Sequence, residues 1–215
     1  MGTQITTAEL ATELESGFGW VGDEEQLLAR TMVSLLGAGE PIDAGRLADA
    51  FGSSATEVNA RLAEVPGVYR DDEGRVVGLW GLSVVEMPHR LHVDDRELYA
   101  WCAWDTLFLP IVLGEEVAVE STCPTTGEPI TLTVSPHGFR DVSPSSAVMS
   151  FLRPREGGFT GDVIGSFCHF VHYFASPDAA EGWVADHEGT FQISIEDGFE
   201  LARFWAARVF GVEER

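Results

Sequence analysis

The chain has 215 residues, a length typical of one medium-sized domain or of a small and a medium domain together. Hydrophobic residues make up 45% of it and charged residues 22%, which excludes global disorder and allows a substantial core. The 13 basic residues, all arginine, are outnumbered by 35 acidic residues, and the net charge is −22. Such an acidic chain is not expected to bind DNA or an anionic membrane surface, because both need clustered basic side chains.

The cysteines and the N-terminus indicate a reducing environment. Three cysteines are present, Cys102, Cys123 and Cys168. They are too few for a disulfide framework in a chain of this size, and the first residues lack a secretory signal pattern. The longest apolar stretch, residues 98–113, is interrupted by Asp105 and Pro110 and is too short to cross a bilayer. We therefore expect a cytoplasmic protein whose thiols are free to bind metals or to take part in catalysis.

The N-terminal part has the pattern of a winged helix. Residues 1–22 are polar, with a short helix predicted at 7–15, and we interpret them as a leader that can be flexible. Apolar residues then recur at helical spacing, and alternating residues around a DDEG turn predict a hairpin. The predicted helices span 24–36, 43–51 and 53–63, and the predicted strands span 68–70 and 76–84. Three helices and a hairpin within residues 23–86 indicate a winged-helix-like domain.

A winged helix often binds DNA, but the charges argue against that role here. The predicted recognition helix, residues 54–64, has one arginine, Arg61, beside Glu57 and Glu64, and the tip of the wing is acidic. DNA phosphates would be repelled by this surface. We predict a structural or dimerising role for this domain and no DNA partner.

Residues 87–215 predict an α+β domain that carries the catalytic residues. We expect a helix over 96–109, capped by Asp94 or Asp95 and bent or ended by Pro110. Further strands are predicted at 117–121, 130–135, 147–152 and 166–174, and further helices at 178–187 and 196–210. This order indicates an antiparallel or mixed sheet with flanking helices.

Asp105 is the most unusual residue for its position. The predicted helix 96–109 is apolar around nearly its whole circumference, so we expect it to be buried. A buried carboxyl costs several kcal/mol unless it is paired or protonated. Cys102 lies three residues earlier and would share a helical face with it. Asp105 either caps a nearby backbone group or pairs with an arginine, or it has a raised pKa and exchanges a proton with the neighbouring thiol.

The other two cysteines are less informative alone. Cys168 lies in the aromatic segment 166–174, where period-two alternation places it on the face opposite Phe167. A cysteine in such a strand is usually a small core residue, and Cys123, in a turn without a companion ligand, is predicted to be structural. Two thiols and one carboxyl indicate a site for a very soft metal ion, since two thiolates favour linear coordination whereas zinc needs four ligands.

Three segments together resemble the organomercurial (alkylmercury) lyases of mercury-resistance systems. They are LYAWCAWDTL at 98–107, STCPTTGEP at 121–129 with LTVSP at 132–136, and SFCHFVHYFAS at 166–176. The likeness extends over about residues 24–211 and includes the winged-helix-like part. The resemblance implies that Cys102, Asp105 and Cys168 are the catalytic set and that Cys123 is structural. Some members of the family carry a second cysteine where this chain has His169.

The family cleaves carbon–mercury bonds by protonolysis to a hydrocarbon and Hg(II), and the resemblance implies the same reaction here. The thiolates of Cys102 and Cys168 would bind mercury and Asp105 would carry the proton, so that all three residues hold the product Hg(II) transiently. Trp101 and Phe167 flank these residues and are expected to bind the alkyl or aryl group of the substrate. No cofactor is expected. Small external thiols and a mercuric reductase are the implied acceptors of Hg(II), and the protein would be a monomer or a homodimer.

The residues leave open a function of another class, a non-catalytic thiol-based sensor or chaperone for a soft metal. Its ligands would be Cys102, Cys168, His169 and His172. The acidic recognition helix argues against a sensor, and Asp105 argues against a chaperone, because a thiol pair needs no buried proton donor. Such a protein would bind metal stoichiometrically and release no hydrocarbon.

Overall fold

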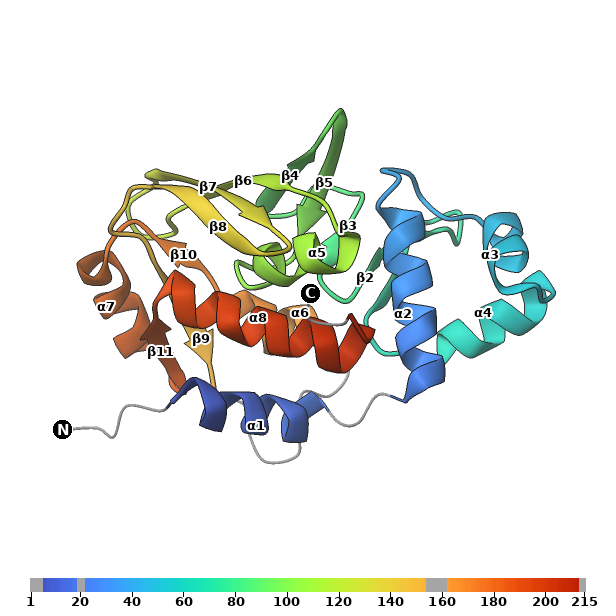
Figure 1. The fold of residues 1–215 in the computed structure, drawn as a ribbon, viewed down its shortest axis with the longest axis horizontal. Coiled ribbons are helices and arrows are strands. Elements are labelled where there is room, and N and C mark those ends of the chain that lie inside the picture. Colours follow the sequence, from blue (N-terminus) through green and yellow to red (C-terminus); the bar gives the residue numbers. More distant parts are fainter. Residues whose placement is uncertain (1–5, 19–21, 154–161, 213–215) are drawn as a thin grey trace.

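A computed structural model describes residues 6–18, 22–153 and 162–212. The first part of the chain forms α1 (Thr7–Phe18), α2 (Asp23–Leu36), α3 (Ala44–Phe51), α4 (Ala55–Ala63), β1 (Val68–Arg70), β2 (Val76–Leu79), β3 (Leu82–Ser83), β4 (His89–Val93) and β5 (Arg96–Ala100). The second part forms α5 (Asp105–Leu113), β6 (Val117–Thr122), β7 (Pro129–Ser135), β8 (Gly138–Ser143), β9 (Val148–Leu152), α6 (Val163–Ser166), the short 3-10 helix η1 (Cys168–Phe170), β10 (Tyr173–Phe174), α7 (Pro177–Asp186), β11 (Thr190–Ile193) and α8 (Ile195–Phe210). Figure 1 shows α2, α3 and α4 at one end of the molecule, with α8 lying across its centre and α1 beneath α8.

The N-terminal helices lie where the sequence predicts them. The predictions for α2, α3 and α4 are confirmed to within two residues, and α4 begins with a capping box between Ser54 and Glu57. The predicted strand 76–84 is wrong in one respect, because the chain reverses within it and forms two paired strands, β2 and β3. The reversal occurs at Trp80 and Gly81, which both have positive φ angles, 41° and 97°.

One antiparallel sheet joins the N-terminal hairpin to the rest of the protein. Its order is β1-β2-β3-β5-β4-β6-β7-β8, and a second antiparallel sheet has the order β10-β9-β11. The joint is the pairing of β3 with β5, in which Leu82 lies opposite Ala100. The α+β class is confirmed, with every described strand pair antiparallel.

The helix predicted over 96–109 is wrong in its first half. Residues 96–100 form β5, which pairs with β4 through a tight turn at Asp94 and Asp95. Asp94 has a φ of +50°, a conformation that aspartate tolerates in hairpin turns, so the two acids mark a turn and not a helix cap. The helix α5 begins at Asp105 and continues through Pro110 to Leu113. Among the described residues, no helix is both long and apolar enough to cross a membrane.

The strand predicted over 166–174 is also wrong. The segment consists of the end of α6, the single turn η1 and the two-residue strand β10. Phe167 has φ −133° and ψ −60° and Cys168 begins a 3-10 turn, so the backbone here is not extended and the alternation of a strand does not apply. The aromatic side chains are buried here because the turn is packed into the core and not because they lie on one face of a sheet.

Helix α8 covers the buried helix α5 with its apolar face. The amphipathic pattern predicted for 196–210 is confirmed, since Ala202 and Val209 on this face are buried. Trp104 donates from Nε1 to the backbone oxygen of Gly198 at 3.1 Å. Its ring lies among other aromatic rings, those of Phe108, Phe151, Phe167 and Trp205. The aromatic cluster therefore fixes the segment that leads into α5.

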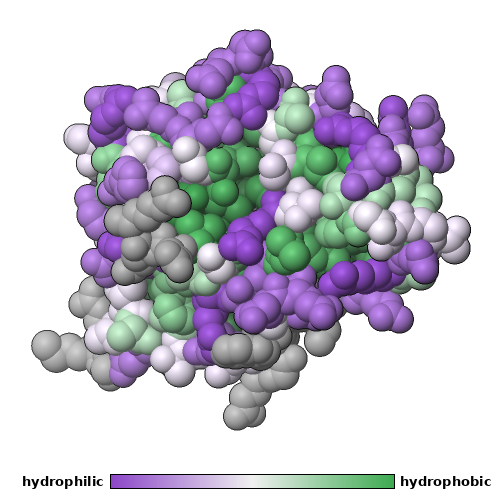
Figure 2. All heavy atoms as spheres, turned by 45° about the vertical axis from the view of Figure 1, so that its right-hand side comes forward, coloured by the Kyte–Doolittle hydropathy of each residue, from purple (hydrophilic) through white to green (hydrophobic). Residues whose placement is uncertain are grey.

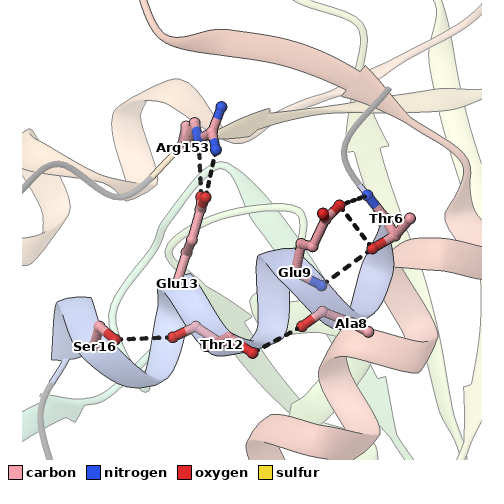
Figure 3. Close-up of polar contacts among 7 residues, drawn as sticks. All are labelled: Thr6, Ala8, Glu9, Thr12, Glu13, Ser16 and Arg153. Atoms are coloured by element: carbon pink, nitrogen blue, oxygen red, sulfur yellow. Dashed lines mark hydrogen bonds and ion pairs between the residues drawn. The ribbon is translucent and has the colours of Figure 1, made fainter. Parts of the chain in front are cut away.

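Part of the predicted leader is a packed helix. The helix predicted at 7–15 is confirmed as α1, and its residues Leu10 and Leu14 are buried. On its polar face Glu13 accepts hydrogen bonds from Arg153, as Figure 3 shows. Helix α1 also contacts α8, to which Glu15 is bound by Arg208. The rest of the leader before α2, residues 1–5 and 19–21, lies outside the described residues.

A buried histidine in the large sheet makes stability depend on pH. His89 is 3% exposed, and its Nδ1 is 2.9 Å from Oγ of Ser121, whereas Nε2 has no partner among the described residues. Burial lowers its pKa to about 3, from 6.5. Between pH 6.5 and 3 this histidine is protonated in the unfolded chain but stays neutral in the folded protein. We therefore expect the free energy of unfolding to fall, as the pH decreases through this range, by up to about 1.4 kcal/mol per pH unit.

Urea unfolding of the parent and of His89→Gln between pH 7 and 4 measures this contribution. The glutamine amide keeps a hydrogen-bonding group near Ser121 but does not titrate, so its stability should fall less steeply with decreasing pH. His92→Gln, on the same strand with its side chain 38% exposed, is the matched control for the change of residue type. Equal slopes for the parent and His89→Gln would contradict the prediction.

Candidate active site

Cys102 and Asp105 lie in the turn that joins β5 to α5. Asp105 is the first residue of α5, and its Oδ2 accepts a hydrogen bond of 2.8 Å from the backbone N–H of Cys102. An acid in the first turn of a helix commonly reaches back in this way to an unpaired N–H. The cap predicted as one alternative for Asp105 is therefore present. It also fixes the direction of the carboxyl group relative to the Cys102 side chain.

Cys168 reaches the same point from a distant part of the chain. It begins the turn η1, directly after Phe167, and its Sγ lies 4.0 Å from Oδ2 of Asp105. The two sulfurs and a carboxylate oxygen of Asp105 all lie within 4.8 Å of one another, and all three residues are buried. The three residues predicted to be catalytic are thus brought together.

Burial raises the pKa values of all three side chains in this cluster. It raises the pKa of the Asp105 carboxyl to about 7, although hydrogen bonds from Cys102 act in the opposite direction. Burial also raises the pKa of the Cys102 thiol well above its usual range, helped by Cys168 and by the charge of Asp105. For Cys168, a hydrogen bond from Cys102 lowers the pKa, but burial and the charge of Asp105 outweigh it and the net direction is upward. The resting site therefore holds protonated thiols beside an acid that can exchange a proton near neutral pH.

A small apolar cavity opens onto the cluster. Its volume is about 130 Å³, and Asp105 and Cys168 supply polar groups to its wall. The remaining wall is mostly aromatic, from Trp80, Trp101, Trp104, Phe108, Phe167 and Trp205. Trp101 and Phe167, the residues predicted to bind substrate, both line it. On the face drawn in Figure 2, apolar residues gather in a hollow that is bordered by hydrophilic ones.

Three other residues considered from the sequence lie outside the cluster. Cys123 lies in the turn after β6, where its Sγ is 3.3 Å from Oγ1 of Thr125. His169 is exposed. Nε2 of His172 lies 2.7 Å from the backbone oxygen of His169, within hydrogen-bond distance. Within the described ranges, Cys102, Asp105 and Cys168 are the one group of three such side chains close enough to share a metal ion.

Sequence reasoning missed the N-terminal contribution to the cavity. Pro66, Trp80 and Gly81 line it, although all three precede the predicted catalytic domain. The signal that could have found them is the pair of glycines, Gly78 and Gly81, inside the apolar run 76–84, since a glycine in a strand pattern indicates a close backbone approach.

Comparison with known proteins decides the family. The model of the alkylmercury lyase family matches residues 82–207, and the model of the helix-turn-helix domain of alkylmercury lyase matches residues 4–80. The chain belongs to the alkylmercury lyase family. It is 39% identical to an alkylmercury lyase of Bacillus cereus over 208 residues, which cover 97% of this chain and 94% of that protein. It is 37% identical to an alkylmercury lyase of Pseudomonas putida over 215 residues, which cover 100% and 99% of the two chains.

The fold agrees with the family assignment. The crystal structure of the mercury-bound form of MerB2 superposes with a TM-score of 0.78 at 25% identity, over 94% of this chain and 99% of that one. The resemblance predicted from the three sequence motifs is therefore confirmed, and this alkylmercury lyase is an enzyme that acts on organomercurial compounds. The two matched regions meet at the turn formed by Trp80 and Gly81, which lines the cavity.

Proposed function

We propose that Cys102 and Cys168 bind the mercury atom of an organomercurial and that Asp105 donates the proton that releases the hydrocarbon. The observation that carries this assignment is the placement of two sulfurs and one carboxylate oxygen within 4.8 Å of one another at an apolar cavity. Two thiols supply the soft ligands that mercury prefers, and the acid lies close enough to pass a proton to an atom bound to the same mercury.

The reaction balances with these three side chains alone. When the mercury of R–Hg–SR′ bonds to one sulfur, that thiol loses its proton to Asp105, because a coordinated metal deprotonates a thiol. The second sulfur then bonds to mercury, and R′S⁻ leaves with the other thiol proton as R′SH. The carbon–mercury bond breaks with its electron pair on carbon, which takes the proton from Asp105 as R–H. Mercury stays as Hg(II) on two thiolates, and no electron acceptor or resident cofactor enters any step.

The cavity supports an organic group of modest size. Its volume of about 130 Å³ is close to the roughly 150 Å³ of an apolar cavity that accommodates benzene. A methyl, short alkyl or phenyl group can therefore lie against Trp101 and Phe167 while mercury reaches the sulfurs. We propose both alkyl and aryl compounds as substrates.

Hg(II) leaves by thiol exchange in this proposal. Two protein thiolates hold the ion in a narrow buried site, so small external thiols are needed to remove it and pass it to a mercuric reductase. A reducing cytoplasm would supply such thiols and keep the three cysteines free.

In this proposal the N-terminal unit, residues 23–86, serves to form the wall of the cavity and does not bind DNA. Arg61, the cation of the predicted recognition helix, lies 3.6 Å from Glu24. At the tip of the wing Arg75 is bound to Asp71 at 2.7 Å. These contacts neutralise the basic side chains that a phosphate backbone would need.

Headspace gas chromatography with methylmercury and excess small-molecule thiol tests the function. Methane should appear in proportion to the methylmercury consumed, through many turnovers per protein molecule. Tight stoichiometric binding of mercury without methane would overturn the proposal in favour of a non-catalytic metal-binding protein.

A further inference from the structure

The turn between β2 and β3 packs directly on the Asp105 carboxyl. Gly81 in this turn has a φ of +97°, and a Cβ added to it would lie 2.7 Å from both Cγ and Oδ1 of Asp105. Carbon side chains do not approach other atoms so closely in folded proteins. The turn can contact the Asp105 carboxyl only because residue 81 is glycine and has no side chain.

The turn is held in this position from both sides. The backbone oxygen of Gly81 accepts a hydrogen bond of 3.0 Å from the N–H of Trp101, the residue before Cys102. Trp80 donates from Nε1 to the backbone oxygen of Pro66 at 2.7 Å. The φ of +41° at Trp80 is an uncommon conformation for a large residue, and these contacts stabilise it. The turn therefore forms a fixed wall beside the reactive groups.

Contact with this wall restricts the position of the acid. The Cys102 N–H fixes Oδ2 of Asp105, while the position that a Cβ on Gly81 would take lies against Cγ and the other oxygen, Oδ1. Backbone in van der Waals contact with a carboxyl also keeps water from that side of it. Both effects favour a carboxyl that passes its proton to the substrate carbon and not to solvent.

We propose that Gly81 is a positioning residue for the proton donor Asp105, through which the N-terminal unit takes part in the lyase reaction. This inference rests on the proposed role of Asp105. It predicts that the missing side chain at position 81 matters for the chemical step and not for mercury binding.

The test compares Gly81→Ala with Gly74→Ala. Gly74 lies in the neighbouring hairpin turn with a similar φ of +78°, but a Cβ there would meet nothing within 4 Å. The control thus reproduces the backbone strain without the contact. We expect Gly81→Ala to lower kcat for methane release by about a hundredfold, as a misplacement of about 1 Å can. KM and the stoichiometry of Hg(II) binding should change less than twofold, and Gly74→Ala should keep the parental kcat. A parental kcat in Gly81→Ala, or an equal loss in both variants, would overturn the proposal.

A second pair of variants covers the case in which Gly81→Ala folds poorly. In Asp105→Ala, two of the three close contacts of the added Cβ disappear. The loss of melting temperature caused by Gly81→Ala should therefore be much smaller in the Asp105→Ala background than in the parent. Equal losses in the two backgrounds would show that Gly81 does not act through Asp105. This thermal measurement does not depend on turnover, so it separates a failure of this inference from a failure of the proposed reaction.

Discussion

Cys168→Ala is expected to reduce hydrocarbon release from methylmercury to the rate measured without protein. The reason is that the site offers two soft ligands, Cys102 and Cys168, and the described residues place no third thiol beside them. With one sulfur left, mercury keeps the small thiol with which it arrived as its second ligand. The carbon–mercury bond is then no more activated than it is in solution.

The matched control for this prediction is Cys123→Ala. Cys123 is also buried, at 1% exposed, but its sulfur contacts Thr125 and lies outside the reactive cluster. We expect Cys123→Ala to lose some thermal stability and to keep methane release, while Cys102→Ala behaves like Cys168→Ala. Headspace gas chromatography of the three variants with equal mercury loading makes the comparison. Near-normal turnover in either cluster variant would rule out a mechanism that uses both sulfurs.

Asp105→Asn is expected to keep mercury binding and to lose hydrocarbon release by about 10²–10⁴-fold, the range over which a positioned general acid contributes. The amide has nearly the shape of the carboxyl, and its oxygen can still accept the N–H of Cys102. It cannot receive a thiol proton and pass it to carbon. Single-turnover methane release, measured beside Hg(II) stoichiometry, separates these steps. Unchanged turnover would identify water as the proton source.

The same substitution is expected to make the protein more stable above neutral pH. The pKa of Asp105 is about 7 in the folded protein against 3.8 ordinarily, so the folded state holds a proton that the unfolded chain releases. Relative to high pH, this pKa difference adds to the free energy of unfolding. The added stability is complete below pH 3.8 and is lost as the pH rises through 7. It corresponds to about 4 kcal/mol at most, a cost that the neutral asparagine does not carry. Chemical unfolding at pH 8 should therefore show an inactive variant that is more stable than the parent, and a less stable one would contradict the assignment.

The helices of the N-terminal unit and of the C-terminus could be predicted from sequence, because each has an apolar stripe ended by a clear cap or glycine. The segment 96–109 could not, since its strand, RELYA, leads into the apolar helix with no glycine or proline between them, and the acids before it fit a cap as well as a turn. The proximity of Cys102 and Asp105 was nevertheless predicted correctly. Their spacing of three residues joins them at a helix N-terminus just as it would within a helix.

The position of Cys168 beside Asp105 could not be predicted from local sequence patterns. No periodicity links it to Cys102, and the alternation predicted around it does not exist, because Phe167 and Cys168 lie at the start of a tight turn. The residue types indicate a soft-metal site of two thiols and one carboxyl, and the resemblance of three separate motifs to a known family then assigns Cys102 and Cys168 to that site. The contact of Gly81 with Asp105 is likewise a matter of tertiary packing, for which the sequence carries no more than two glycines in an apolar run.

The pairing of β3 with β5 places the N-terminal hairpin and the strands β4 to β8 in one continuous sheet. A fragment that began at residue 82 would keep all three reactive side chains, yet it would lose the cavity wall formed by Pro66, Trp80 and Gly81. It would also lose β2, so that β3 would become an exposed edge with unpaired backbone groups. The region that matches the helix-turn-helix model thus supplies part of the wall around the reactive acid, and its removal is expected to open that acid to water.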